Sequence, residues 1–184
     1  MGNLILNTIL ARSSIRAYQN EPLCEGELEF LKKAALASPT AMNRQTQRFI
    51  FVTSEDKRER LEQAIVEGVI ASGNTDFIER MKSRGGKVTY GAPLVVLICA
   101  APGKFAPVDA GIAVENIAIA AKSIGLDSVI LGMPATAFSG PNAEEVKREF
   151  GFPEGYDFQI AISVGRGAME KAPHEWDESH VIML

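Results

Sequence analysis

The segment from Val108 to Ile124 limits most strongly what this chain can fold into. Alanine, valine and isoleucine cover nearly the whole circumference of the helix expected there, and Gly125 follows as its C-terminal stop. A membrane-spanning helix needs ~20 residues free of such charges, whereas this shorter segment contains Asp109, Glu115 and Lys122. We therefore expect a helix that is buried in a protein core or across a subunit interface.

Helices and strands alternate along the rest of the chain. The spacing of apolar residues and caps predicts helices at Leu4–Leu10, from about Glu25 to Ala37, after Ser54, and from Asn142 to Gly151. Strands are predicted at Phe49–Thr53, Leu94–Ala100, Ser128–Gly132 and Phe158–Val164. The pattern predicts a single α+β domain over residues 1–184, with three α/β/α layers and a mixed central sheet flanked by helices.

Composition indicates which classes of partner this chain is expected to bind and in which cellular compartment it is expected to lie. The net charge of −4 over 184 residues disfavours nonspecific attraction to nucleic acid or to membranes. The two cysteines, Cys24 and Cys99, lack metal-ligand spacing, so no metal site is predicted. A reduced, cytoplasmic setting is the default for such a chain.

Acid–base and nucleophilic catalysis find little support in the sequence. Both histidines, His174 and His180, lie in the C-terminal tail, and no Ser/His/Asp or Cys/His arrangement stands out. The glycines of "VGRGAME" fall short of a dinucleotide fingerprint because Glu170 takes the third glycine position. One interpretation is that the chain borrows its chemistry from a cofactor.

Two short stretches are candidates for binding. In "ARSSIRAY", two arginines bracket two serines after a short helix. This is either a solvated helix end or a site for an oxyanion such as phosphate, because guanidinium and hydroxyl groups form charge-assisted hydrogen bonds. In "ASPTAMNRQTQRF", small and polar residues separate a helix from a strand. This stretch is either a loose connector or a polar shelf for a flat, hydrogen-bonding ligand.

Five stretches in order resemble the nitroreductase family of FMN-dependent oxidoreductases. They are "RSSIRAY", "ASPTAMNRQTQRF", "YGAPLVVLI", "VDAGIAVENIAIAAKSIGLDSVILGMP" and "GFPEGYDFQIAISVGRG", which together cover almost the whole chain. The resemblance implies the nitroreductase-like fold and an intertwined homodimer with FMN sites at the subunit interface. It also places the helix Val108–Ile124 in the dimer core.

The resemblance assigns roles to residues of this sequence. Arg12 and Ser14, with Ser13 beside them, match the residues that bind the phosphate. Arg166 is the candidate for a second cation at the phosphate, and Lys171 and His174 are the alternatives to it. Arg16 matches the basic residue near flavin N1 and O2, and Leu131 and Gly132 match the strand end whose backbone N–H approaches flavin N5. Lys87 is a further candidate at the pyrimidine edge. The loop beside the ring, reaching it from the partner subunit, matches Ser38, Pro39, Thr40, Asn43 and Gln45.

The implied reaction takes hydride from NADPH or NADH onto flavin N5 and passes electrons to a nitroaromatic, a quinone or a similar electron-poor acceptor by a ping-pong mechanism. Three alternatives stay open. The same flavin could reduce activated alkenes or carbon–halogen bonds, the chain could bind FMN for a sensory or storage role without turnover, or it could be a structural dimer without a cofactor.

Overall fold

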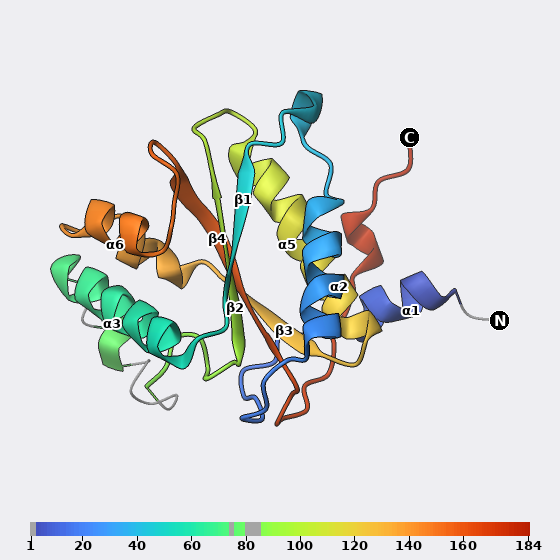
Figure 1. The fold of residues 1–184 in the computed structure, drawn as a ribbon. Coiled ribbons are helices and arrows are strands. Elements are labelled where there is room, and N and C mark those ends of the chain that lie inside the picture. Colours follow the sequence, from blue (N-terminus) through green and yellow to red (C-terminus); the bar gives the residue numbers. More distant parts are fainter. Residues whose placement is uncertain (1–2, 74–75, 80–85) are drawn as a thin grey trace.

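The computed structural model describes residues 3–73, 76–79 and 86–184. At its centre lies a four-stranded sheet with the order β1-β2-β4-β3 (Figure 1). The strands are β1 (Gln47–Val52), β2 (Leu94–Ala100), β3 (Asp127–Leu131) and β4 (Asp157–Gly165). All four lie within about two residues of the ranges that the sequence predicts.

The predicted three-layer arrangement is confirmed, but the paired strands are antiparallel rather than mixed. Each neighbouring pair of strands is antiparallel, and among the described residues only the isolated bridge between Ser14 and Ser128 is parallel. Helix α5 (Ala106–Ser123) returns the chain so that β3 runs in the same direction as β2. The later strand β4 then inserts between them, which makes both of its contacts antiparallel. Alternation of helices and strands along a sequence does not reveal such an insertion.

Helices cover both faces of the sheet (Figure 1). One face carries α3 (Glu55–Ala71), the short helix η2 (Met133–Phe138) and α6 (Ala143–Glu149), and the other carries α2 (Glu25–Leu36) and α5. Every residue of β2 is buried, as its uninterrupted apolar run predicts. Its side chains alternate between the two cores, with Val95, Leu97 and Cys99 in one and Leu94, Val96 and Ile98 in the other.

Helix α5 has a buried face and an exposed apolar face. Ala110, Ala113 and Ile117 pack in the core beneath the sheet, where small side chains allow the helix to approach closely. Val108 and Ile112 lie on the outside, 57% and 38% exposed. In the described ranges, no helix combines the length and the apolar character needed to cross a bilayer.

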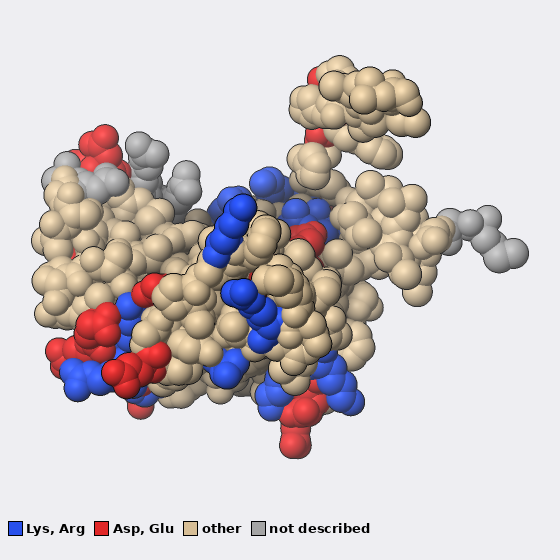
Figure 2. Space-filling model, turned by 90° about the horizontal axis from the view of Figure 1, so that it is seen from above, with Lys and Arg blue, Asp and Glu red and all other residues tan. Residues whose placement is uncertain are grey.

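The N-terminal segment runs from an exposed helix to the sheet. No residue of α1 (Leu4–Ala11) is buried, and Figure 2 shows uncharged surface beside the N-terminal end. After α1, the N–H of Ile15 donates to the Ser128 carbonyl at 3.0 Å, and the N–H of Ala168 donates to the Ala17 carbonyl at 2.9 Å. Residues 13–18 therefore lie between the start of β3 and the chain that follows β4.

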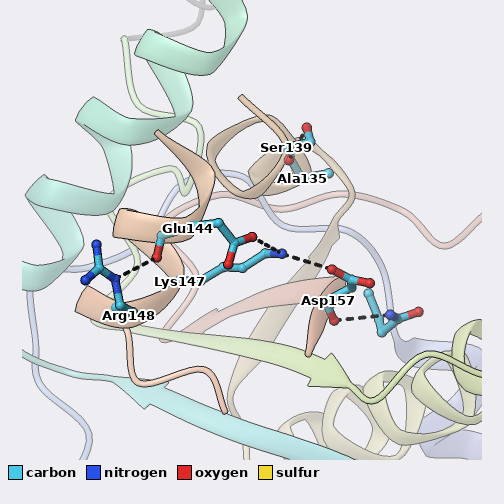
Figure 3. Close-up of polar contacts among 7 residues, drawn as sticks. Ala135, Ser139, Glu144, Lys147, Arg148 and Asp157 are labelled. Carbon is cyan, nitrogen blue, oxygen red and sulfur yellow. Dashed lines mark hydrogen bonds and ion pairs between the residues drawn. The ribbon is translucent and has the colours of Figure 1, made fainter. Parts of the chain in front are cut away.

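Lys147 connects α6 to the start of β4. Its ammonium contacts the carboxylates of Glu144 and Asp157, each at 2.9 Å (Figure 3). These contacts, led by the hydrogen bond that Lys147 donates to Glu144, raise the pKa of Lys147. The cluster stabilises the connection between α6 and the sheet.

Candidate functional site

A cavity of about 260 Å³ opens at the carboxyl end of β3. Arg16, Leu131 and Gly132, which come from separate stretches of the sequence, line it together. The cavity is also lined by Lys87, Val88 and Tyr90 and by Phe77 and Met133. The structure therefore brings three of the predicted site residues into one cavity and adds Lys87, which the sequence left open.

The cavity combines positive charge with apolar walls. The guanidinium of Arg16 donates to the Ser14 carbonyl at 3.4 Å, and the backbone N–H of Arg16 donates to Met169 Sδ, also at 3.4 Å. Lys87 supplies a second cation, and no carboxylate lies among the described residues that line the cavity. An anionic or electron-rich group is therefore favoured there over a cation.

Gly132 leaves the end of β3 open to a ligand. A Cβ atom built on Gly132 would meet no heavy atom within 4 Å, and the residue is exposed. A flat ligand can therefore approach this backbone more closely than it could beside a larger residue. Leu131, one residue earlier, is 6% exposed and fixes the strand end in the core.

The residues of the segment 12–16 contact different parts of the structure. Arg12 Nε lies 3.5 Å from Glu115 Oε1 on α5. The hydroxyl of Ser13 donates to the Lys171 carbonyl at 2.9 Å, and Ser14 bridges to Ser128 at the start of β3. Of the segment's predicted residues, only Arg16 lines the cavity at β3.

The three candidates for a second phosphate-side cation lie in different surroundings. Arg166 Nη2 contacts Glu27 at 2.8 Å, and Arg166 Nε contacts Glu21 at 3.4 Å, so two carboxylates already engage this guanidinium. His174 is exposed in the tail. Lys171 is the candidate whose backbone meets Ser13.

The loop Ser38–Gln45 is fixed on helix α5. The N–H of Ala41 donates to Asp109 Oδ1 at 2.9 Å, and Asn116 Nδ2 donates to Ser38 Oγ at 3.0 Å. Within the loop, Thr40 Oγ1 accepts from the Gln45 N–H at 3.0 Å, and Asn43 Oδ1 accepts from Gln45 Nε2 at 2.8 Å. Hydrogen bonds therefore order this stretch, in contrast to a loose connector.

Unusual backbone angles also characterise this loop. Met42, Asn43 and Gln45 have φ values of 55°, 52° and 49°, which L-residues adopt at an energetic cost. Such strain persists where surrounding contacts enforce it, and it is common at binding sites.

The loop borders a second groove rather than the cavity at β3. Ser38, Gln45 and Gln47 line a groove of about 550 Å³ together with Arg48, Phe49 and Phe51. The residues that line this groove and those that line the cavity do not overlap. Within one chain, the two halves of the predicted flavin site are separate.

Tyr18 is a structural neighbour of the site. Its hydroxyl donates to the carbonyl oxygens of Ile15 at 2.8 Å and of Ser163 at 3.3 Å. Burial, followed by the nearby charge of Asp127, raises the pKa of Tyr18 far above its ordinary value. A phenol held neutral in this way anchors the N-terminal segment and is a poor acid or base near neutral pH.

Several residues that line the cavity have no individual role in the family resemblance. Tyr90 and Met133 lie in a turn and a short helix that fall within stretches resembling the family, but the resemblance assigns no role to either side chain. The one local signal was the glycine and proline punctuation of "TYGAP", which is typical of a turn with unusual backbone angles. Tyr90 and Gly91 indeed have φ values of 58° and 68°.

Comparisons with known proteins identify the fold and the family of this chain. A nitroreductase with bound FMN from Desulfitobacterium hafniense has a TM-score of 0.90 and 34% identity, with 100% of both chains covered. A nitroreductase with bound FMN from Bacteroides fragilis has a TM-score of 0.90 and 24% identity over 100% of both chains. A relative from Archaeoglobus fulgidus, whose name pairs NADH dehydrogenase with NAD(P)H nitroreductase, is 28% identical over 183 residues, 94% of this chain and 91% of the relative. The family model for the nitroreductase family matches residues 9–166, and the chain therefore belongs to the nitroreductase family.

Proposed function

We propose that the protein is an FMN-dependent NAD(P)H oxidoreductase that reduces electron-poor acceptors. The observation that carries this proposal is that Arg16 and Lys87 share one cavity with the open backbone of Gly132. The bound FMN of the Desulfitobacterium hafniense nitroreductase and the NAD(P)H in the name of the Archaeoglobus fulgidus relative support the cofactor and the electron donor.

The residues present fit an FMN molecule. A flavin ring has an apolar body and a polar edge, and the cavity has apolar walls at Val88, Leu131 and Met133 beside two cations. When bound, FMN supplies the chemistry of accepting hydride and passing on electrons. Arg12, Ser13 and Ser14 would hold the phosphate, and of the candidates for a second cation Lys171 meets Ser13 through its backbone, whereas two carboxylates engage Arg166.

Three residues of the cavity would have a physical task in this scheme. Arg16 and Lys87 would stabilise negative charge at the polar edge of a reduced flavin ring. Gly132 allows the backbone to lie against the ring. The described residues that line the cavity include no histidine or carboxylate, so protons would come from solvent water.

The acceptor would be a nitroaromatic, a quinone or a related electron-poor compound. In a ping-pong mechanism, the oxidised nicotinamide would leave before the acceptor takes its place against the same face of the bound ring.

We also propose that two copies of this single-domain chain form a homodimer. Supporting this, Ser38 and Gln45 border a groove separate from the cavity, so a second copy is needed to bring the loop Ser38–Gln45, with Pro39, Thr40 and Asn43, to the ring. The exposed apolar residues of α1 and α5 offer a surface for such a contact; they are Leu4, Ile5, Leu6, Ile9, Val108 and Ile112.

The visible spectrum of the purified protein tests the proposal. We expect bound FMN, identified by mass after denaturation, that bleaches rapidly when NADPH or NADH is added and regains colour with a quinone or nitroaromatic. Colourless protein that takes up no added FMN would refute the proposal. Bound FMN that neither nicotinamide reduces would instead indicate a binding protein with a sensory or storage role.

A further inference from the structure

We propose that Glu62 of helix α3 is a positioning residue that holds the Lys87–Tyr90 wall of the cavity in place for FMN. This inference rests on the proposed function, because it assigns Glu62 a role in the same site. Glu62 does not line the cavity itself; it acts through the turn that does.

The carboxylate of Glu62 accepts three hydrogen bonds from two adjacent residues of this turn. Glu62 Oε2 accepts from the Val88 N–H at 2.8 Å, and Oε1 accepts from the Thr89 N–H at 2.8 Å and from the Thr89 hydroxyl at 2.5 Å. Bonds to an ionised acceptor are stronger than neutral ones. The site is sheltered, since Val88 and Thr89 are only 6% and 2% exposed, so lost partners would leave buried donors unsatisfied.

Other contacts hold the far side of the same turn. The hydroxyl of the fully buried Ser163 donates to the Thr89 carbonyl at 3.0 Å. Arg58, one helical turn before Glu62, donates to the Ala92 carbonyl at 2.9 Å. Helix α3 thus offers an acceptor to the backbone N–H groups and a donor to a backbone carbonyl, which fixes the turn at both ends.

The turn needs this support because its backbone is strained and because it carries ligand-facing side chains. Tyr90 and Gly91 both have positive φ, and for Tyr90 this conformation is costly. Lys87, Val88 and Tyr90 all line the cavity. A shift of Val88 and Thr89 would therefore move Lys87 relative to Arg16, which lines the same cavity.

The first test measures the contact itself in protein without cofactor. In Glu62→Gln, the side-chain amide keeps one oxygen that can accept, but its NH₂ group would face the backbone N–H donors of the turn. The backbone N–H groups of Val88 and Thr89 should therefore exchange hydrogen at least about tenfold faster. Glu67→Gln is the matched control, because Glu67 lies on the same helix, carries the same charge and has an outward ion pair with Arg60. Unchanged exchange at Val88 and Thr89 in Glu62→Gln would overturn the proposal.

The second test measures the consequence for the site. We expect Glu62→Gln to weaken FMN binding by about tenfold and to lower the midpoint potential of bound flavin, with Glu67→Gln unchanged. Lys87→Met should lower the potential as well, and Glu62→Gln should lower it little further in that background, because both changes remove the same cation from its place. If Glu62→Gln fails to fold, Thr89→Val, which keeps the backbone N–H and loses the hydroxyl, should show the same changes in smaller measure.

The outcomes separate this inference from the function on which it rests. Parent protein that binds no FMN would sink the proposed function and this inference together. Parent protein that binds and reduces FMN, with affinity and potential unchanged in both Glu62→Gln and Thr89→Val, would sink the role of Glu62 alone. Potential shifts that add fully in the double variant with Lys87→Met would show that Glu62 does not act through Lys87.

Discussion

At the scale of single residues, the structure separates the two arginines of the N-terminal segment. Arg12 lies against Glu115 on α5, and Arg16 lines the cavity. If Arg12 binds the phosphate, Arg12→Ala should weaken FMN roughly ten- to a hundredfold, the effect of a lost charged hydrogen bond. Excess FMN should restore activity. Arg16→Gln should instead leave oxidised FMN bound and slow its reduction by NAD(P)H, because the lost charge matters most when the ring becomes negative.

Rapid mixing with NAD(P)H and titration with FMN measure these two effects. Arg148→Gln, an exposed arginine on α6, serves as the control and should change neither. A parent-like reduction rate and flavin potential in Arg16→Gln would place the functional cation elsewhere in the cavity, at Lys87.

Cys99 gives a residue-scale prediction about stability. Burial raises the pKa of the Cys99 thiol from 9.0 to about 11. The folded protein therefore keeps the thiol proton at pH values where the unfolded chain has lost it, and the free energy of unfolding should fall as pH rises from about 9 to about 11.

Urea unfolding at about pH 8 and about pH 10.5 tests this. The loss of stability between the two pH values should be smaller in Cys99→Ala than in the parent, by about 2 kcal/mol. Cys24→Ala, which removes an exposed thiol, should keep the parent's pH dependence. Equal losses in the parent and in Cys99→Ala would contradict the prediction.

How far the site could be predicted also depends on single residues. Arg16, Leu131 and Gly132 match family motifs and line one cavity, so the resemblance brought these three residues together correctly, while their roles toward FMN stay a prediction. The sequence did not point to Glu62, because its proposed role depends on two backbone N–H groups that lie 26 and 27 residues later. No local pattern records such a contact. The paired state of Arg166 was equally hidden, since it depends on how α2 packs.

At the scale of secondary structure, the packing of α3 on η2 depends on Gly68. A Cβ atom at Gly68 would lie 2.0 Å from the Thr136 carbonyl oxygen, so Gly68→Ala should force the two helices apart. We expect a loss of about 1–3 kcal/mol in the free energy of unfolding, the usual range for overpacking. Gly26→Ala on α2 is the control, because its Cβ would meet only Cys24 Sγ at 4.0 Å. Equal stability of the two variants in urea would refute this.

Most elements were predictable because their signals are local. The apolar run of β2 and the spacing of α2 and α3 define them within a few residues. The predicted cap at Ser54 was right in position, yet its side chain makes no capping hydrogen bond. The direction of the strands was not predictable, because β4 enters the sheet between two strands that precede it in the sequence.

At the scale of the whole molecule, the apolar circumference of α5 has two explanations rather than one. Ile117 is fully buried within the chain's own core, so its apolar character serves the monomer. Val108 and Ile112 remain on the outside, beyond what the monomer can bury. Only this outer face bears on the proposed dimer, and a test of the dimer must therefore leave Ile117 unchanged.

Ile112→Asp tests the dimer on that outer face. An aspartate there would be solvated in a monomer but buried without a partner in a dimer, so the dimer should dissociate at micromolar concentration while the monomer stays folded. Because the loop Ser38–Gln45 is proposed to reach the ring of the other copy, FMN should be lost with the dimer. Ile70→Asp is the matched control: Ile70 is 60% exposed, but it lies on α3, on the opposite side of the sheet. Light scattering at micromolar concentration should show monomers for Ile112→Asp and dimers for Ile70→Asp and the parent. A monomeric Ile112→Asp variant that keeps FMN with parent affinity would mean that one chain builds the whole flavin site.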